Sequence, residues 1–81
     1  MFTQQQVWTG IDALARDRGW SMSRLALEAG LDPTALNRSK RVGQEGRPRW
    51  PSTETLARLL SATDTSLAEF NRLMQAGAGG D

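Results

Sequence analysis

The chain has 81 residues, which is enough for one domain with a modest hydrophobic core. It contains no cysteine and no histidine, which excludes disulfides, thiol nucleophiles, Cys/His zinc sites and imidazole acid-base catalysis. No apolar stretch approaches the roughly 20 residues of a membrane span, and the first residues do not read as a signal peptide. We therefore expect a soluble, cytoplasmic protein without a metal or a cofactor.

The formal net charge of +1 conceals an uneven distribution. Residues 37–50 hold five cations and only one anion, Glu45, for a net charge of +4, which leaves −3 for the rest of the chain. The cations are Arg38, Lys40, Arg41, Arg47 and Arg49. A local excess of this kind is typical of a surface that binds a polyanion, although a solvated loop is the simpler alternative for each arginine.

Apolar residues at helical spacing, among them Val7, Ile11 and Leu14, predict a helix over residues 3–18, with Thr3 as its N-cap. Gly10 lies inside this helix, where glycine lowers the stability of the helix by roughly 1 kcal/mol relative to alanine. Either another backbone passes close to Gly10, or the helix is weak at this point.

The next segment predicts two short helices joined by a sharp turn. The first begins at Ser21 or Met22, continues to residue 29 and is closed by Gly30, which adopts positive φ freely. Asp32 reads as the N-cap of the second, and proline suits the first position of that helix, which is predicted over residues 33–40. A connection of about three residues makes the two helices cross steeply.

The remainder of the chain predicts a loop and two further helices. Residues 41–51 are rich in glycine and proline and form the loop. Helices follow over residues 53–62, capped by Ser52, and over residues 67–74. The second of these offers apolar side chains either to the core or to a dimer surface, namely Leu67, Phe70, Leu73 and Met74.

The C-terminal composition sets the domain boundary. Residues 76–81 are glycine-rich and typical of a flexible tail or linker, so the folded domain is predicted over residues 1–75.

Small and apolar residues in the short-helix pair have mechanical roles. Ala26 lets the two helices approach closely, Gly30 makes the turn, and Leu36 anchors the second helix to the core. The sequence SRLALEAGLDPTAL, residues 23–36, resembles the helix-turn-helix of the phage-repressor/Cro type, the XRE family. Residues 48–51 with 53–60, and residues 66–70, resemble the fourth and fifth helices of that family, so the resemblance covers nearly the whole chain.

The resemblance implies an all-α, five-helix lambda-repressor-like domain that binds a palindromic DNA operator as a homodimer and represses transcription. It places residues 33–40 in the major groove as the recognition helix. Base contacts would come from Pro33, Thr34, Asn37 and Arg38, with asparagine suited to adenine and arginine to guanine. Phosphate contacts would come from Ser21, Ser23, Lys40, Arg41, Arg47 and Arg49.

The chain departs from the family pattern in two places. Many members have glutamine at the start of the first helix of the pair, where this chain has Met22. The loop over residues 41–51 is also longer than usual.

Three tryptophans, Trp8, Trp20 and Trp50, are predicted to pack in the core, with base-stacking platforms as the alternative. The acidic residues are expected on exposed helix faces without a cluster, and no nucleophile is paired with a base, so we expect no enzyme. Two other readings remain: a protein-interaction module on the same scaffold, such as an antitoxin or adaptor, and a DNA-binding domain regulated by a further C-terminal part.

Overall fold

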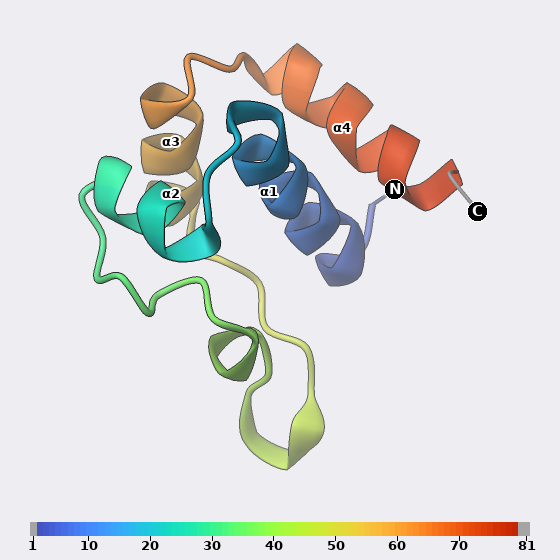
Figure 1. The fold of residues 1–81 in the computed structure, drawn as a ribbon. Helices are drawn as coiled ribbons and strands as arrows, with labels where there is room; N and C mark the ends of the chain where they lie inside the picture. The colour runs from blue at the N-terminus through green and yellow to red at the C-terminus, as the bar shows by residue number, and fades with distance from the viewer. Residues whose placement is uncertain (1, 80–81) are drawn as a thin grey trace.

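The computed structural model describes residues 2–79, and its regular elements there are all helical (Figure 1). The only β-type pairing among these residues is a single antiparallel bridge between Val42 and Pro48. The elements are α1 Gln4–Arg18, α2 Met22–Glu28, the 3-10 turn η1 Arg38–Arg41, a tight turn Gln44–Gly46, α3 Thr53–Ala62 and α4 Leu67–Gly79. The all-α prediction is therefore confirmed, with four α-helices rather than five.

Helix α1 begins and ends where the sequence predicts. The Thr3 hydroxyl accepts a hydrogen bond from the Gln6 backbone N–H at 3.1 Å, and the Gln6 side chain accepts one from the Thr3 N–H at 2.8 Å. This capping box satisfies two N–H groups that the first turn leaves without partners. Gly19 ends the helix with φ of 69°, in the left-handed region.

Helices α1 and α4 lie side by side and form most of the core (Figure 1). A Cβ atom at Gly10 would lie 2.9 Å from both the Phe70 ring and Met74 Cγ. Gly10 is thus explained by a close approach, but of α4 side chains rather than of another backbone. Phe70 and Met74 are core residues, whereas Leu67 at the start of α4 is 69% exposed.

Helix α2 packs against the core through Leu25 and Ala26. Leu25 and Ala26 are fully buried, and the Ser21 hydroxyl accepts a hydrogen bond from the Arg24 N–H at 3.0 Å. Gly30 has φ of 76°, and the Leu31 N–H donates to the Ala26 carbonyl at 2.9 Å. The predicted helix and its glycine turn are both confirmed.

The helix predicted over residues 33–40 is wrong. Residues 33–36 form turns, Asn37 is extended with ψ of 152°, and only the four residues of η1 are helical, with 3-10 geometry. Leu36 is the only buried residue of the segment. A regular helix here would have no apolar face to pack against the core, and such packing supplies most of the stability of short helices. Threonine, asparagine and serine also bind nearby backbone groups and favour turns over helix interiors.

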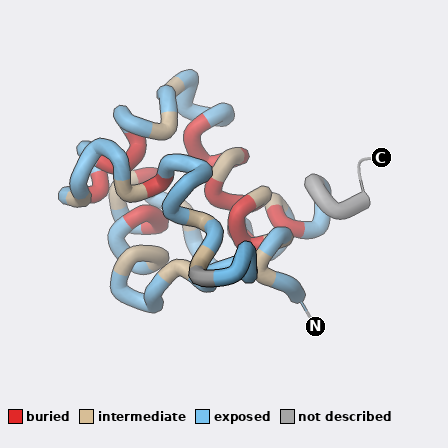
Figure 2. The backbone as a smooth tube through the Cα atoms, turned by 90° about the horizontal axis from the view of Figure 1, so that it is seen from below, coloured by how far each residue is buried: buried red, intermediate tan, exposed pale blue. Residues whose placement is uncertain are grey.

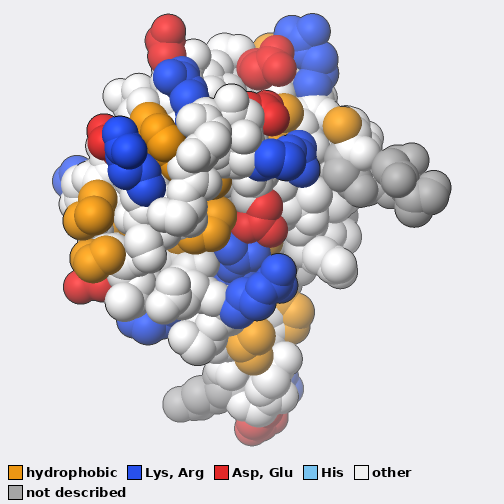
Figure 3. Space-filling view, in the orientation of Figure 1, with side chains coloured by type: hydrophobic (Ala, Val, Ile, Leu, Met, Phe, Trp, Pro, Cys, Tyr) orange, Lys and Arg blue, Asp and Glu red, His pale blue; other side chains and the backbone are white. Residues whose placement is uncertain are grey.

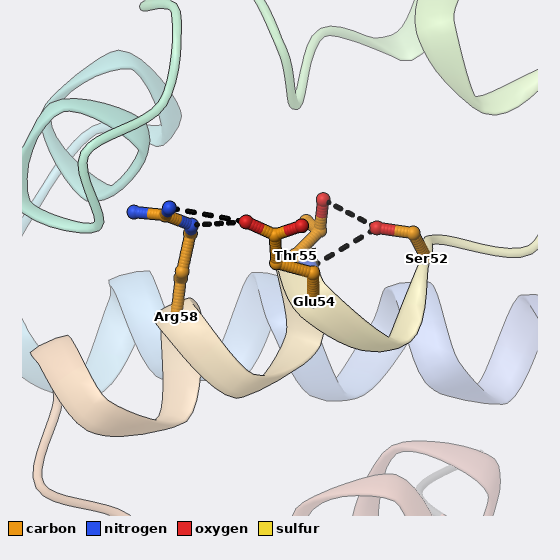
Figure 4. A network of polar contacts seen from close by, with 4 residues as sticks. All are labelled: Ser52, Glu54, Thr55 and Arg58. Atoms are coloured by element: carbon orange, nitrogen blue, oxygen red, sulfur yellow. Dashed lines mark hydrogen bonds and ion pairs between the residues drawn. The ribbon is translucent and has the colours of Figure 1, made fainter.

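Helix α3 has the predicted bounds, because its cap is a strong local signal (Figure 4). The Ser52 hydroxyl accepts from the Thr55 N–H at 3.0 Å. One turn later, the Arg58 guanidinium donates to the Glu54 carboxylate at 3.0 and 3.2 Å. Helix α4 is longer than predicted and continues through residues 76–79, while residues 80 and 81 of the expected tail lie outside the described part of the chain.

The tryptophans divide into three environments. Trp8 is 8% exposed and belongs to the core. Trp20 is half-buried against the core, with the guanidinium groups of Arg18 and Arg24 over its ring. Trp50 is 52% exposed, so its predicted core position is wrong. Among the described residues, no helix has both the length and the apolar character needed to cross a membrane.

Candidate nucleic-acid interface

Residues 33–41 contain one buried residue, Leu36, and the rest are exposed or partly buried. Figure 2 colours the whole backbone by burial in this way. Leu36 is 1% exposed and belongs to the core cluster to which all four α-helices contribute. The four residues predicted to contact bases are all exposed: Pro33, Thr34, Asn37 and Arg38. Leu36 therefore attaches the segment to the core while these four residues stay exposed.

The segment starts with a turn that is stabilised by its own side chains. The Asp32 carboxylate accepts hydrogen bonds from the Thr34 hydroxyl at 2.6 Å and from the Thr34 N–H at 2.8 Å. The Thr34 hydroxyl, then its N–H and the charge of Lys40 lower the pKa of Asp32 below its usual value of 3.8. Asp32 therefore caps a turn here, since no α-helix follows it.

Arg41 ties the end of the segment to α1. Its guanidinium donates to the Asp12 carboxylate at 2.7 and 3.2 Å and to the Leu36 carbonyl at 3.2 Å. It also lies over the Trp8 ring, 4.9 Å from the ring centroid. The side chain is only 11% exposed, so in this conformation Arg41 is not placed to reach the phosphate predicted for it.

The following loop is tied to the same place. The Trp8 indole N–H donates to the Arg49 carbonyl at 2.8 Å, and the Arg49 N–H donates to the Arg41 carbonyl at 2.9 Å. Closer to the tip, the Gly43 N–H donates to the Arg47 carbonyl at 2.6 Å. These bonds make residues 41–49 a short antiparallel loop whose base rests on α1.

The remaining cations of the segment face solvent. Among the described residues, Arg38, Lys40 and Arg49 form no ion pair, and all three are exposed. Arg47 lies 3.8 Å from Glu45, with both side chains about four-fifths exposed, a geometry of little energetic consequence. Figure 3 shows basic side chains near the place where the loop leaves the body of the molecule, and others spread over the same face.

The two serines predicted to bind phosphate lie at the start of α2. Both are exposed, but the Ser21 hydroxyl is already used as the N-cap acceptor. Ser23 lies in the first turn of the helix.

Several acidic residues pair with arginines. The Asp12 carboxylate holds Arg41, while Glu28 and Glu54 pair with Arg24 and Arg58 on their own helices. Within residues 2–79, no group of three or more acidic side chains lies close enough to hold a metal ion. The pairing of Asp12 with Arg41 was not foreseen, because it joins residues 29 apart and leaves no local signal in the sequence.

Comparisons with family models, with curated proteins and with solved structures found no match for this chain.

Proposed function

We propose that this chain is a double-stranded DNA-binding domain of a transcriptional regulator, most simply a repressor. The observation that carries the proposal is the position of the cations. Four of the five cations of residues 37–50 are exposed, namely Arg38, Lys40, Arg47 and Arg49, with one anion, Glu45, among them, whereas the rest of the chain carries −3. Such a surface attracts the phosphate backbone and orients the protein on it.

The polar side chains beside these cations supply the means to read bases. Asn37 and Arg38 are neighbours, both exposed, and their side chains match the major-groove edges of adenine and guanine. The reading element is a turn followed by η1, in place of the regular helix that the family resemblance implies. Lys40, Arg47 and Arg49 contact phosphates, and Arg41 positions the loop.

The XRE resemblance adds the mode of action. Residues 23–36 keep the alanine, the glycine turn and the buried leucine of that motif, and all three have their expected environments. A homodimer on a palindromic operator would place two half-sites about one helical turn apart. Repression then follows from occlusion of the site.

The test is selection of bound duplexes from a random pool, followed by fluorescence anisotropy. Recovery of an inverted repeat supports both the function and the dimer. Simultaneous Asn37→Ala and Arg38→Ala substitutions should weaken binding to the selected duplex at least tenfold and relax its sequence preference. Arg72→Ala is the matched control, because Arg72 is an exposed arginine on α4 that pairs with Glu69. Equal affinity of the double variant and the control would remove residues 37 and 38 from the proposal.

One observation favours a second function, protein interaction. Leu67 is 69% exposed beside a hollow lined by Leu56 and Leu60, between α3 and the start of α4. Salt separates the two functions, because DNA binding weakens steeply as salt rises whereas an apolar protein interface responds little. Binding of any partner with no salt dependence would favour the second function.

A further inference from the structure

A hollow of about 450 Å³ opens between α1, the start of α2 and residues 36–41, and we call it the basic hollow. Its volume falls within the range of roughly 300 to 1,000 Å³ that is usual for small-molecule sites. Two apolar side chains line it, namely Leu36 and Met22, and Met22 is partly buried against the core. The rest of the lining is polar or charged, so the hollow suits a molecule with both an apolar and a charged part.

The charged lining of the basic hollow carries a positive surplus. Arg41 is neutralised by the Asp12 carboxylate, which accepts hydrogen bonds from its guanidinium at 2.7 and 3.2 Å. Arg16 pairs with Asp17 only at 3.8 Å, and both side chains are exposed, which makes that pair weak. Arg38 forms no ion pair among the described residues. Two guanidinium groups that line the hollow are therefore available to an anion.

The side chains of the basic hollow match an aromatic carboxylate. Guanidinium groups pair with carboxylates through two parallel hydrogen bonds and also stack on aromatic rings. The methionine thioether makes favourable contacts with aromatic rings, so Met22 supplies an apolar wall for the ring. Position 22 is also where the chain departs from the XRE pattern, in which glutamine is common. Inorganic phosphate would satisfy the arginines but leave Met22 without a partner.

We infer that the basic hollow binds a small aromatic carboxylate, and that this ligand competes with DNA. Asn37 and Arg38 line the hollow and are also proposed to contact bases, so they cannot serve both partners at once. The bound acid therefore releases the protein from its operator. The competition rests on the proposed function, whereas the binding of the acid does not.

Binding is measured first without DNA, by isothermal titration calorimetry on the full chain. The probe is 2-naphthoate, compared with its uncharged analogue 2-naphthamide and with inorganic phosphate. Naphthoate should bind at least tenfold more tightly than either, because the amide lacks the charge and phosphate lacks the ring. In an NMR titration, naphthoate should also shift the side-chain amide signals of Asn37, which lines the hollow.

Two variants test the place of binding. Arg16→Gln removes one available guanidinium and should weaken naphthoate binding at least tenfold. Met22→Gln replaces the apolar wall and should weaken it several-fold. Arg72→Gln is the matched control, because Arg16 and Arg72 both have side chains that are 74% exposed and pair with an acid on their own helix. Circular dichroism checks the helix content, and the exposed Arg16 keeps the test valid if Met22→Gln loses helix.

Competition is then measured by anisotropy on the selected duplex. Sodium naphthoate replaces sodium chloride at constant ionic strength, because DNA binding depends on salt. At ten times the dissociation constant of naphthoate, simple competition weakens duplex binding about elevenfold in the natural chain and in Arg72→Gln. In Arg16→Gln the same concentration should weaken it only about twofold, while duplex affinity without naphthoate stays that of the natural chain.

The outcomes separate this inference from the proposed function. No naphthoate binding by a chain that binds DNA overturns the inference alone, and so does binding that survives in Arg16→Gln. Equal affinity for naphthoate and phosphate, or for naphthoate and naphthamide, overturns the ligand class. Naphthoate binding that leaves duplex affinity unchanged overturns the competition. A chain that binds naphthoate but no duplex overturns the proposed function and leaves the ligand site standing.

Discussion

Gly10 shows how one absent side chain sets the spacing of two helices. Its α-carbon lies where the Phe70 ring and Met74 cross α1, and both of these side chains are buried. The Gly10→Ala variant gains about 1 kcal/mol of helix propensity but must displace a rigid ring in the core, which typically costs 1 to 3 kcal/mol. We expect a net loss of roughly 1 kcal/mol in the free energy of unfolding, measured by urea denaturation.

Ser61→Ala is the control for this prediction, since Ser61 is an exposed residue inside α3. Its free energy of unfolding should change by less than about 0.5 kcal/mol. A Gly10→Ala variant as stable as the natural chain would mean that α4 does not pack on α1 as closely as the structure shows.

The Asp12 carboxylate has a role that its exposure alone does not reveal. It accepts two hydrogen bonds from a guanidinium that is only 11% exposed. Because hydrogen bonds to charged groups contribute about 1.5 to 3 kcal/mol, Asp12→Ala should lower the free energy of unfolding by roughly that amount. The basic loop should also be cleaved faster by trypsin, which cuts after its arginines and lysine.

Asp17→Ala gives the matched comparison on the same helix. Asp17 is exposed and lies 3.8 Å from Arg16, so its removal should leave stability and cleavage nearly unchanged. Equal behaviour of the two variants would show that Arg41 does not depend on Asp12.

The helices that could be predicted are those with strong local signals at their ends. Thr3, Ser21 and Ser52 cap α1, α2 and α3 through their own hydroxyls, and Gly19 and Gly30 end the first two in positive φ. Each of these caps is formed by residues a few positions apart, so the caps can be predicted from the sequence alone.

The segment over residues 33–41 could not be predicted in the same way. Asp32 and Pro33 form a correct helix-start signal, but a helix of eight residues needs an apolar face, and Leu36 is the only residue it could bury. The sequence did indicate that Asn37 and Arg38 are exposed, because both are polar residues that directly follow the apolar Leu36. The ties from Asp12 to Arg41 and from Trp8 to Arg49 are long-range, so sequence reasoning missed them and placed Arg41 on phosphate.

The turn at the start of this segment should respond to acid. Its carboxylate, Asp32, has a pKa lowered below 3.8 chiefly by the two hydrogen bonds from Thr34. A folded-state pKa below the unfolded value means that the ionised carboxylate stabilises the turn above pH 3.8, and that this contribution is lost as pH falls through the lowered pKa. The amide resonance of Thr34, followed by NMR, should therefore shift with a midpoint below pH 3.8.

Asp32→Asn keeps an oxygen acceptor but cannot titrate, so the Thr34 resonance should stay constant in this range. A midpoint at or above the usual aspartate value in the natural chain would contradict the hydrogen bonds that define the turn.

At the scale of the whole molecule, the position of charge matters more than its sum. The net charge of +1 is too small to hold a protein on DNA, whereas cations facing one duplex release counterions locally. Two pairs of substitutions lower the net charge equally and separate these effects. Lys40→Gln with Arg49→Gln removes two cations of the basic segment, and Arg58→Gln with Arg72→Gln removes two that pair with acids on α3 and α4.

Each phosphate contact contributes about 0.9 to the slope of log affinity against log salt concentration. The first pair of substitutions should therefore reduce the slope by roughly 1.8, while the second leaves it within error of the natural chain. Anisotropy titrations at several salt concentrations measure both slopes. Equal reductions in the two double variants would mean that the protein approaches DNA through its overall charge alone, and the exposed segment beside α1 would then have no special part in binding.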